Sequence, residues 1–212
     1  MTAPDVIDAH PAADEERPRV VTTLCRAFFD DRIYRWMVPD DAQRRRSAAK
    51  FYTRFVEACW PHGHVYAAGA GAGAALWVPP GADLVGEQEA EAFTRELLES
   101  AGDDECQART AQVFAMLDEH HPSDPHWYLA FMGVDPSAQG QGIGSALLAA
   151  VLAVADRDGM PAYLEASCPE NRQLYERYGF ELVRELTVSD SPAIYAMWRA
   201  PSGRAIPGAT IL

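Results

Sequence analysis

The sequence predicts an α/β (α+β) fold in which one central sheet is flanked by helices. Short apolar runs bounded by glycine and proline read as strands, and they are interspersed with longer amphipathic helical patterns. One apolar run ends in a glycine-rich turn that leads directly into an apolar helix. With 212 residues, 48% of them hydrophobic, the chain is long enough to bury one core. We therefore predict a single domain over residues 1–199 and a flexible tail over 200–212, which holds two prolines and two glycines.

The first 124 residues predict mainly helices and one hairpin. Apolar side chains share one helical face in 20–28 and again in 48–55, and an aromatic connector over 29–39 lies between them. A five-residue turn, 69–73, joins two short strands. The remaining elements predicted here are strands over 64–68 and 74–78 and helices over 87–100 and 105–119.

The second half predicts strands and helices in alternation. An aromatic and branched run over 127–134 stops at Asp135-Pro136, which is typical of a buried strand followed by a turn. The elements predicted after it are a helix over 145–158, a strand over 162–166, a short helix over 169–178 and strands over 181–188 and 193–198.

The glycine-rich turn predicts an anion site made of main-chain groups. Glycines at 140, 142 and 144 let several N–H groups point into one hollow, and the helix that follows adds its unpaired first-turn N–H groups and the positive end of its dipole. Such a turn binds a phosphate or pyrophosphate without a lysine.

Three kinds of nucleotide-binding loop place glycines in this way. A P-loop ends in Gly-Lys-Ser/Thr, but the only lysine is the distant Lys50. A dinucleotide fingerprint from Gly140 misses its third glycine at Ser145, although Glu165 falls where a ribose-binding acid would lie. The third pattern, Gln/Arg-x-x-Gly-x-Gly/Ala, fits every position from Gln139 to Gly144.

This third pattern resembles the coenzyme A pyrophosphate loop of the GCN5-related N-acetyltransferases (GNAT). A second segment, Asn-x-x-x-Tyr-Glu-x-x-Gly-Phe at 171–180, resembles the other signature of that family and lies about thirty residues further on. Residues 125–198 are also similar to the puromycin N-acetyltransferase subgroup, for example in Pro-Ala-Tyr-Leu-Glu at 161–165. The resemblance implies a mixed sheet of about seven strands that splays at a V-shaped cofactor cleft.

The resemblance implies direct acetyl transfer from acetyl-CoA to the primary amine of a small molecule. The pantetheine arm would pair with the strand edge at 132–134, and the N–H near Val134 would stabilise charge on the acetyl oxygen. Tyr175 would act as general acid toward the leaving sulfur, because it shares a helical face with Asn171; its alternative is a buried core aromatic. The implied cofactor contacts are Met132, Gly133, Val134, Gln139, Gly140, Gln141, Gly142, Ile143, Gly144, Ser145, Asn171 and Tyr175.

The general base has three candidates. Glu165 lies centrally in an apolar strand, where burial penalises the charged carboxylate and suits it to proton abstraction. His126 is the rival, and a relay of waters needs neither side chain. Cys168 would permit a ping-pong route, but a buried structural thiol is favoured. We predict no metal, since neither the pair at 120–121 nor His-x-His at 62–64 has a third ligand at a suitable spacing.

Composition bounds the partners and the compartment. The net charge of −13 argues against nucleic acid and anionic membranes, and four scattered cysteines favour free thiols in a reducing, cytoplasmic compartment. Abundant alanine, with arginine as nearly all of the basic residues, suggests a bacterial source.

The acceptor site carries no motif. Tyr34 and Trp36, with Asp30 and Asp31, form either an apolar pocket with an acidic rim or plain core packing. The alternative function is a non-catalytic acyl-CoA-binding sensor of the same fold. A homodimer is possible for either function.

Overall fold

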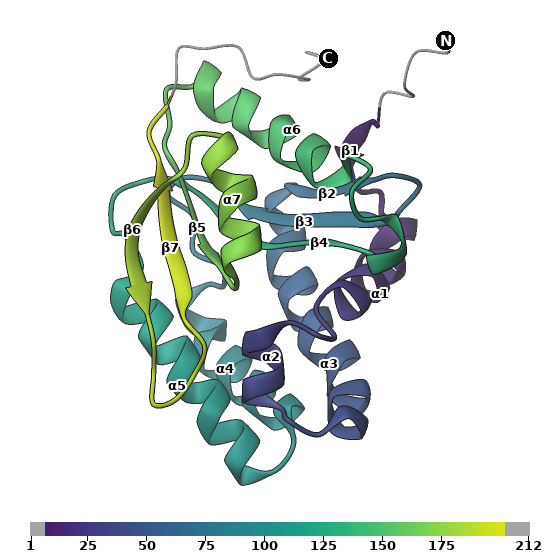
Figure 1. The fold of residues 1–212 in the computed structure, drawn as a ribbon, viewed down its shortest axis with the longest axis vertical. Coiled ribbons are helices and arrows are strands. Elements are labelled where there is room, and N and C mark those ends of the chain that lie inside the picture. Colours follow the sequence, from purple (N-terminus) through teal and green to yellow (C-terminus); the bar gives the residue numbers. More distant parts are fainter. Residues whose placement is uncertain (1–6, 202–212) are drawn as a thin grey trace.

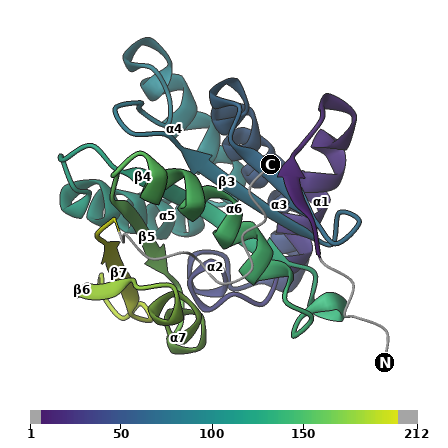
Figure 2. The same cartoon turned by 90° about the horizontal axis from the view of Figure 1, so that it is seen from above.

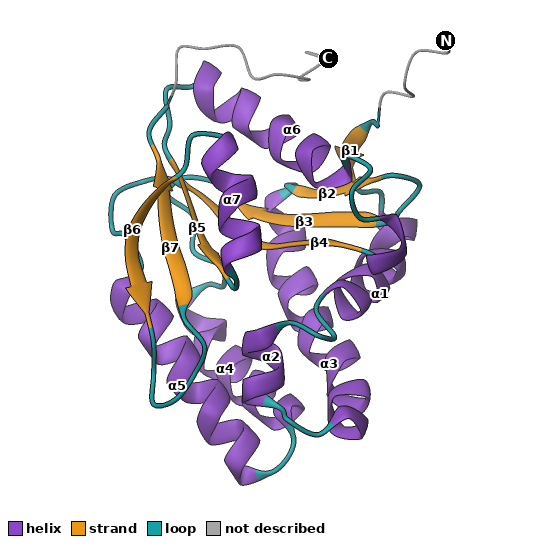
Figure 3. Ribbon diagram, viewed as in Figure 1, coloured by secondary structure: helices purple, strands orange, loops and turns teal. Residues whose placement is uncertain are grey.

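The computed structural model describes residues 7–201, and these form one mixed sheet of seven strands with helices on both faces (Figures 1 and 3). Most of the predicted tail, 202–212, lies outside the described residues. The strands are β1 (Ala9–Pro11), β2 (Val65–Ala68), β3 (Gly73–Val78), β4 (Trp127–Val134), β5 (Ala162–Ala166), β6 (Glu181–Leu186) and β7 (Ile194–Arg199). The helices are α1 (Arg17–Ala27), α2 (Arg32–Met37), α3 (Asp41–Cys59), α4 (Glu87–Ala101), α5 (Asp104–His120), α6 (Ile143–Arg157) and α7 (Pro169–Arg177). The predicted fold class is confirmed.

The sheet splits between its two central strands. The strand order is β1-β2-β3-β4-β5-β7-β6, and only the β4–β5 pair is parallel. That pair holds only from Trp127–Ala162 to Leu129–Leu164. Beyond it, residues 130–134 of β4 have no ladder partner on the β5 side, so main-chain groups of β4 face an opening. This is the predicted V-shaped cleft.

A β-bulge in β4 lies where the sheet splits. Trp77 of β3 pairs with Leu129, but the next β3 residue, Leu76, pairs with Phe131, so Ala130 is an extra residue in β4. Ala130 and Phe131 consequently pack on the same face of the sheet, against the core that holds α3. Met132 and Val134 pack on the opposite face, toward α6.

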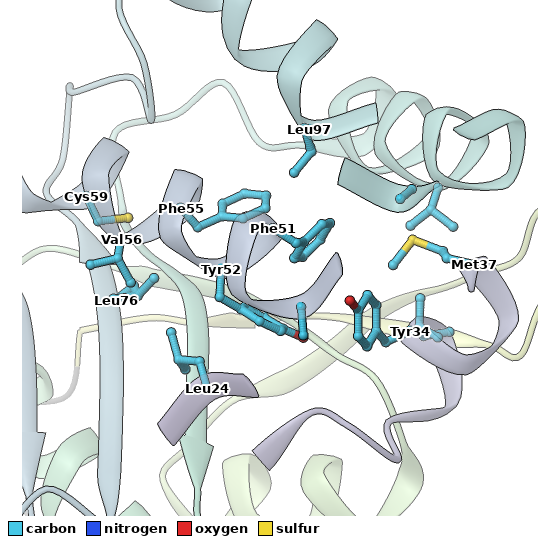
Figure 4. Packing of buried hydrophobic residues seen from close by; sticks show 14 of the residues in the cluster. Leu24, Tyr34, Met37, Phe51, Tyr52, Phe55, Val56, Cys59, Leu76 and Leu97 are labelled. Atoms are coloured by element: carbon cyan, nitrogen blue, oxygen red, sulfur yellow. The ribbon is translucent and has the colours of Figure 1, made fainter. Parts of the chain in front are cut away.

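The helices cover the two faces separately (Figure 2). Helix α6 packs across β1 to β4 on one face, while α1 and α3 pack on the other, and α7 lies against β5. Helices α4 and α5 extend the second layer beyond α3. Figure 4 shows rings from α2 and α3, among them Tyr34, Phe51, Tyr52 and Phe55, packed in this layer.

Two short elements differ from the sequence prediction. Helix α2 lies within the segment predicted as a connector; it has six residues, too few to show a helical period, and begins because Asp31 accepts hydrogen bonds from the N–H groups of Ile33 and Tyr34. Strand β1 was not predicted, since three residues become a strand only by pairing with β2. Helix α6 begins at Ile143, two residues earlier than predicted. Within residues 7–201, no helix is long and apolar enough to span a bilayer.

Candidate acetyl-CoA cleft and acceptor pocket

The turn before α6 forms a cradle of main-chain donors. Gly140 has φ +75° and Gly142 has φ +89°, a left-handed region where only glycine is unstrained. None of the N–H groups from 140 to 145 donates to a residue that the structure describes. Three of these groups, at 143–145, belong to the first turn of α6, where the helix itself supplies no acceptor. The cradle therefore presents unpaired donors and the positive end of a 15-residue helix to an anion.

The β2–β3 hairpin holds this cradle in place. Ile143 packs so closely on the hairpin that a Cβ at Gly73 would lie 2.3 Å from its Cγ2, and one at Gly69 would lie 2.6 Å from its Cδ1. On the other side, Arg26 at the end of α1 forms an ion pair with Asp135 at 3.2 Å. Hydrogen bonds from Ser137 and from Arg26 lower the pKa of the Asp135 carboxyl. The turn is thus fixed to the sheet and to α1.

An open cleft of about 770 Å³ runs from the cradle along the free edge of β4. Gly133 lets α1 close one side, because a Cβ there would lie 2.6 Å from Cβ of Ala27. Helix α7 closes the other side with Asn171, Leu174 and Tyr175. Of the predicted cofactor contacts, only Gln141 is not among the lining residues; it is exposed at the outer end of the turn. The structure therefore brings the predicted contacts together along one cleft.

A second, aromatic pocket of about 120 Å³ lies behind the split. An apolar cavity of roughly 150 Å³ is enough for a benzene ring, so this pocket suits a small apolar group. Phe131, placed by the bulge, contacts Phe28, Tyr52 and Phe55 at ring-centroid distances of 5.5, 5.5 and 4.7 Å. Two carboxylates line the pocket, Asp31 and Glu165, and no basic side chain does. It therefore favours a cationic group with an apolar body.

The cleft and the pocket meet at shared residues. These are Phe28, Asp31, Met132, Asn171 and Tyr175. Asp31 caps α2 with one carboxylate oxygen and accepts a hydrogen bond from the Ser167 hydroxyl with the other, so it links the helical layer to the loop after β5. A ligand bound in the cleft and a ligand bound in the pocket would therefore meet at this junction.

Tyr175 lies at the junction and is 6% exposed. Its ring packs edge-on against Phe180, with centroids 5.9 Å apart. Burial raises the pKa of the Tyr175 phenol, so the phenol stays protonated at physiological pH. Tyr178, off this face, donates to the carbonyl of Ser145 at 3.4 Å.

Glu165 lines the aromatic pocket from β5. Its side chain is 6% exposed, and its Oε1 has no hydrogen-bond partner among the residues described. The Tyr128 and Tyr163 phenols lie close to it: burial, and then the carboxylate charge, raise the pKa of both. A buried carboxylate with a free oxygen in a pocket is suited to receiving a proton.

A wider groove opens behind Glu165, away from the cofactor cleft. It holds about 650 Å³ and shares Phe55, Phe114, Leu117 and Tyr128 with the aromatic pocket. Four carboxylates line this groove and no lysine or arginine does: Asp83, Glu87, Asp118 and Asp124. We call it the acidic vestibule. It offers a cation a second approach to the pocket.

His126 lines the vestibule rather than the pocket. Its Nδ1 lies 2.7 Å from the carbonyl oxygen of Asp124, and its Nε2 is buried without a partner among described residues. Burial lowers the pKa of the imidazole, which favours its neutral form. His121, considered at the sequence level only as half of a histidine pair, lies beside it with ring centroids 5.1 Å apart.

The remaining residues singled out in the sequence lie in different places. Tyr34 lines the pocket, but Trp36 does not; its Nε1 donates to Asp190 at 3.0 Å. Asp30 lines only the cofactor cleft. Cys168 also lines the cleft, and burial raises the pKa of its thiol, which disfavours a nucleophilic thiolate. In the described part of the chain, no group of three or more His, Cys, Asp or Glu side chains is placed to hold a metal ion.

The split sheet, together with the main-chain anion cradle beside it, points to an enzyme that takes acyl groups from coenzyme A. The family model of the acetyltransferase (GNAT) domain matches residues 100–182. An uncharacterised N-acetyltransferase of Schizosaccharomyces pombe is 28% identical over 181 residues, covering 76% of this chain and 69% of that protein. Together, the family model, this relative and the fold support a GNAT-family, acetyl-CoA-dependent acetyltransferase.

Solved structures agree with this assignment. One from Corynebacterium glutamicum, described as histone acetyltransferase HPA2 and related acetyltransferase, is 25% identical and covers 95% of this chain and 99% of that chain, with a TM-score of 0.64. Arylalkylamine N-acetyltransferase 2 from Aedes aegypti is 15% identical over 92% of this chain and 99% of that chain, with a TM-score of 0.58. At that identity the second likeness shows the fold. The similarity to the puromycin subgroup stays a prediction.

Proposed function

We propose that this enzyme acetylates the primary amine of a small molecule by direct transfer. The observation that carries the proposal is the junction at Asp31, Asn171 and Tyr175, where an anion-binding cleft meets a pocket lined by aromatic rings and carboxylates. Similar structures include enzymes described as acting on arylalkylamines and agmatine, both of which are amines.

The chain's main-chain groups would hold the cofactor. The unpaired donors of 140–145 fit a pyrophosphate, and the free edge of β4 at 132–134 fits a pantetheine amide chain as an added strand would. Acetyl-CoA, when bound, supplies the activated acetyl group as its thioester. The N–H near Val134 would stabilise the charge that develops on the acetyl oxygen.

Two side chains would take part in proton transfer, one as a proton acceptor and one as a hydrogen-bond donor. Glu165 removes a proton from the acceptor ammonium, since it lines the aromatic pocket and its Oε1 has no hydrogen-bond partner among the described residues. Tyr175 donates a hydrogen bond to the departing sulfur; because burial raises the pKa of its phenol, it acts as a donor that does not ionise on its own. Asn171 on the same face of α7 orients the pantetheine arm.

The lining of the pocket supports an acceptor with a compact apolar or aromatic body. A bulky acceptor would extend into the acidic vestibule, whose carboxylates favour further positive charge. A histone tail, by contrast, would need a continuous surface groove up to the junction.

The test is release of free thiol from acetyl-CoA in the presence of a panel of amines. The panel includes arylalkylamines, agmatine, polyamines, puromycin and a lysine-containing peptide. We expect turnover with at least one small cationic amine. Tight acetyl-CoA binding without turnover on any amine would favour the non-catalytic sensor, and turnover on the peptide alone would favour a protein acceptor.

A further inference from the structure

The proton that Glu165 receives needs a way out of the protein. Its side chain is buried beneath an aromatic pocket, so the carboxylate cannot exchange freely with bulk water. His121, which follows the last turn of α5, lies next to this carboxylate and is partly exposed to solvent. Its Nδ1 lies 3.8 Å from Oε1 of Glu165, and 34% of its side chain is exposed.

We propose that His121 is the proton exit for Glu165. This rests on the proposed function. In each turnover the acceptor ammonium loses one proton to Glu165, which passes it to Nδ1 of His121. The exposed imidazolium then turns and releases that proton to water. The second proton of the reacting nitrogen stays with the products, since it neutralises the leaving thiolate, so one proton is released per acetyl group transferred.

The distance suits a transfer that tightens during catalysis. A separation of 3.8 Å is too long for a hydrogen bond and too short for a water between the two atoms. Rotation about the side-chain torsions of His121 closes it, and catalytic hydrogen bonds are often long before substrate binds. Edge-on rings of Tyr128 and Tyr163, with centroids 4.7 and 5.2 Å away, hold the imidazole toward Glu165.

The neighbours of His121 do not provide a better outlet. His126 is 8% exposed, with Nδ1 engaged by the carbonyl of Asp124, and burial lowers its pKa. The phenols of Tyr128 and Tyr163 have raised pKa values and hold their protons. The titratable groups that face His121 or share its two grooves are Asp83, Glu87, Asp118, Glu119, His120, Asp124, His126, Tyr128, Tyr163, Glu165 and Arg184. Carboxylates outnumber arginines in this set, so the surroundings of His121 carry net negative charge.

Chemical rescue of His121→Ala tests the proposal. We expect kcat to fall at least about tenfold, with the KM for acetyl-CoA unchanged and the melting temperature close to wild type. Added imidazole should restore much of kcat in this variant, because a soluble base then collects the proton from Glu165. Sodium chloride at equal ionic strength should not.

His120→Ala is the matched control. His120 is the adjacent histidine, but its Nδ1 is hydrogen-bonded to the carbonyl oxygen of Met116 at 2.8 Å. The variant should therefore keep the wild-type kcat, and added imidazole should not change it. Wild-type kcat in His121→Ala, or a loss that imidazole does not restore, would overturn the proton exit while leaving the acetyl transfer intact. A wild-type enzyme inactive on every amine would overturn both.

Discussion

In the proposed function, the two sides of the split sheet recognise their ligands by different means. The cofactor cleft relies on main-chain groups: glycines at 140 and 142, the first turn of α6 and the free edge of β4. The aromatic pocket, the proposed acceptor site, is lined by side chains from seven helices and strands that are far apart in the sequence: α2, α3, α5, β4, β5, α7 and β7. A main-chain site is set by local backbone geometry, whereas a side-chain site is set by tertiary packing. Substitutions should therefore separate the two: cleft variants change acetyl-CoA affinity and pocket variants change turnover.

Glu165→Gln should have the largest effect. The amide cannot accept the acceptor's proton, so kcat should fall about a hundredfold, with acetyl-CoA affinity unchanged because Glu165 does not line the cofactor cleft. Rates measured against pH, together with calorimetric titration of acetyl-CoA, check this. Glu181→Gln, the same change at an exposed position in β6, serves as the control. A surviving alkaline rise in activity would remove Glu165 as the base.

Tyr175→Phe tests the boundary between the two sides. We expect turnover to fall about tenfold or more while acetyl-CoA affinity changes little, because the ring stays and only the donor is lost. Since burial raises the pKa of the Tyr175 phenol, the wild-type enzyme should not lose activity through Tyr175 ionisation as the pH rises through 9. Tyr178→Phe is the control, and steady-state kinetics give the answer. Wild-type turnover in Tyr175→Phe would exclude the proposed donor.

Gly142→Ala should act on the cofactor side alone. At φ +89° an alanine is strained by about 1 to 2 kcal/mol, so the cradle distorts and acetyl-CoA affinity should fall roughly tenfold. Gly144→Ala is the comparison: its φ is ordinary for an L-residue, and an added Cβ would meet its neighbours at 3.7–3.8 Å, so the loss should be smaller. Equal losses in the two variants, measured by calorimetry, would argue that strain in the turn is irrelevant.

Arg26→Ala should have the smallest effect. The Arg26–Asp135 ion pair joins α1 to the turn, but the arginine side chain is 67% exposed. Its loss should lower the free energy of unfolding by less than about 1 kcal/mol, and less still in high salt. Denaturant titrations at two salt concentrations measure this. A loss well above that range would mean that the turn and α1 are coupled more strongly than one exposed pair allows.

The sequence predicted the cofactor side far better than the acceptor side. The order of strand, glycine turn, helix, strand and short helix in 127–178 was readable because each step is marked by local glycine, proline or apolar patterns. The acceptor pocket was not, since an aromatic such as Tyr34 or Trp36 looks the same in sequence whether it faces a cavity or the core. His121 was missed as a partner of Glu165 because only the tertiary fold brings the residue after α5 next to β5.

In the proposed function, the bulge at Ala130 lets one strand, β4, contact both the cofactor and the acceptor. The bulge shifts the side-chain alternation by one residue. Even-numbered residues such as Tyr128 face the layer of α1 and α3 before it, and odd-numbered residues such as Phe131 and Gly133 face that layer after it. If β4 kept the same residues but paired without the bulge, the faces of its distal half would be exchanged: Phe131 would leave the aromatic wall, and Met132 would take the place of Gly133 beneath α1. Substitutions around this strand that are meant to change the acceptor therefore have to preserve the bulge.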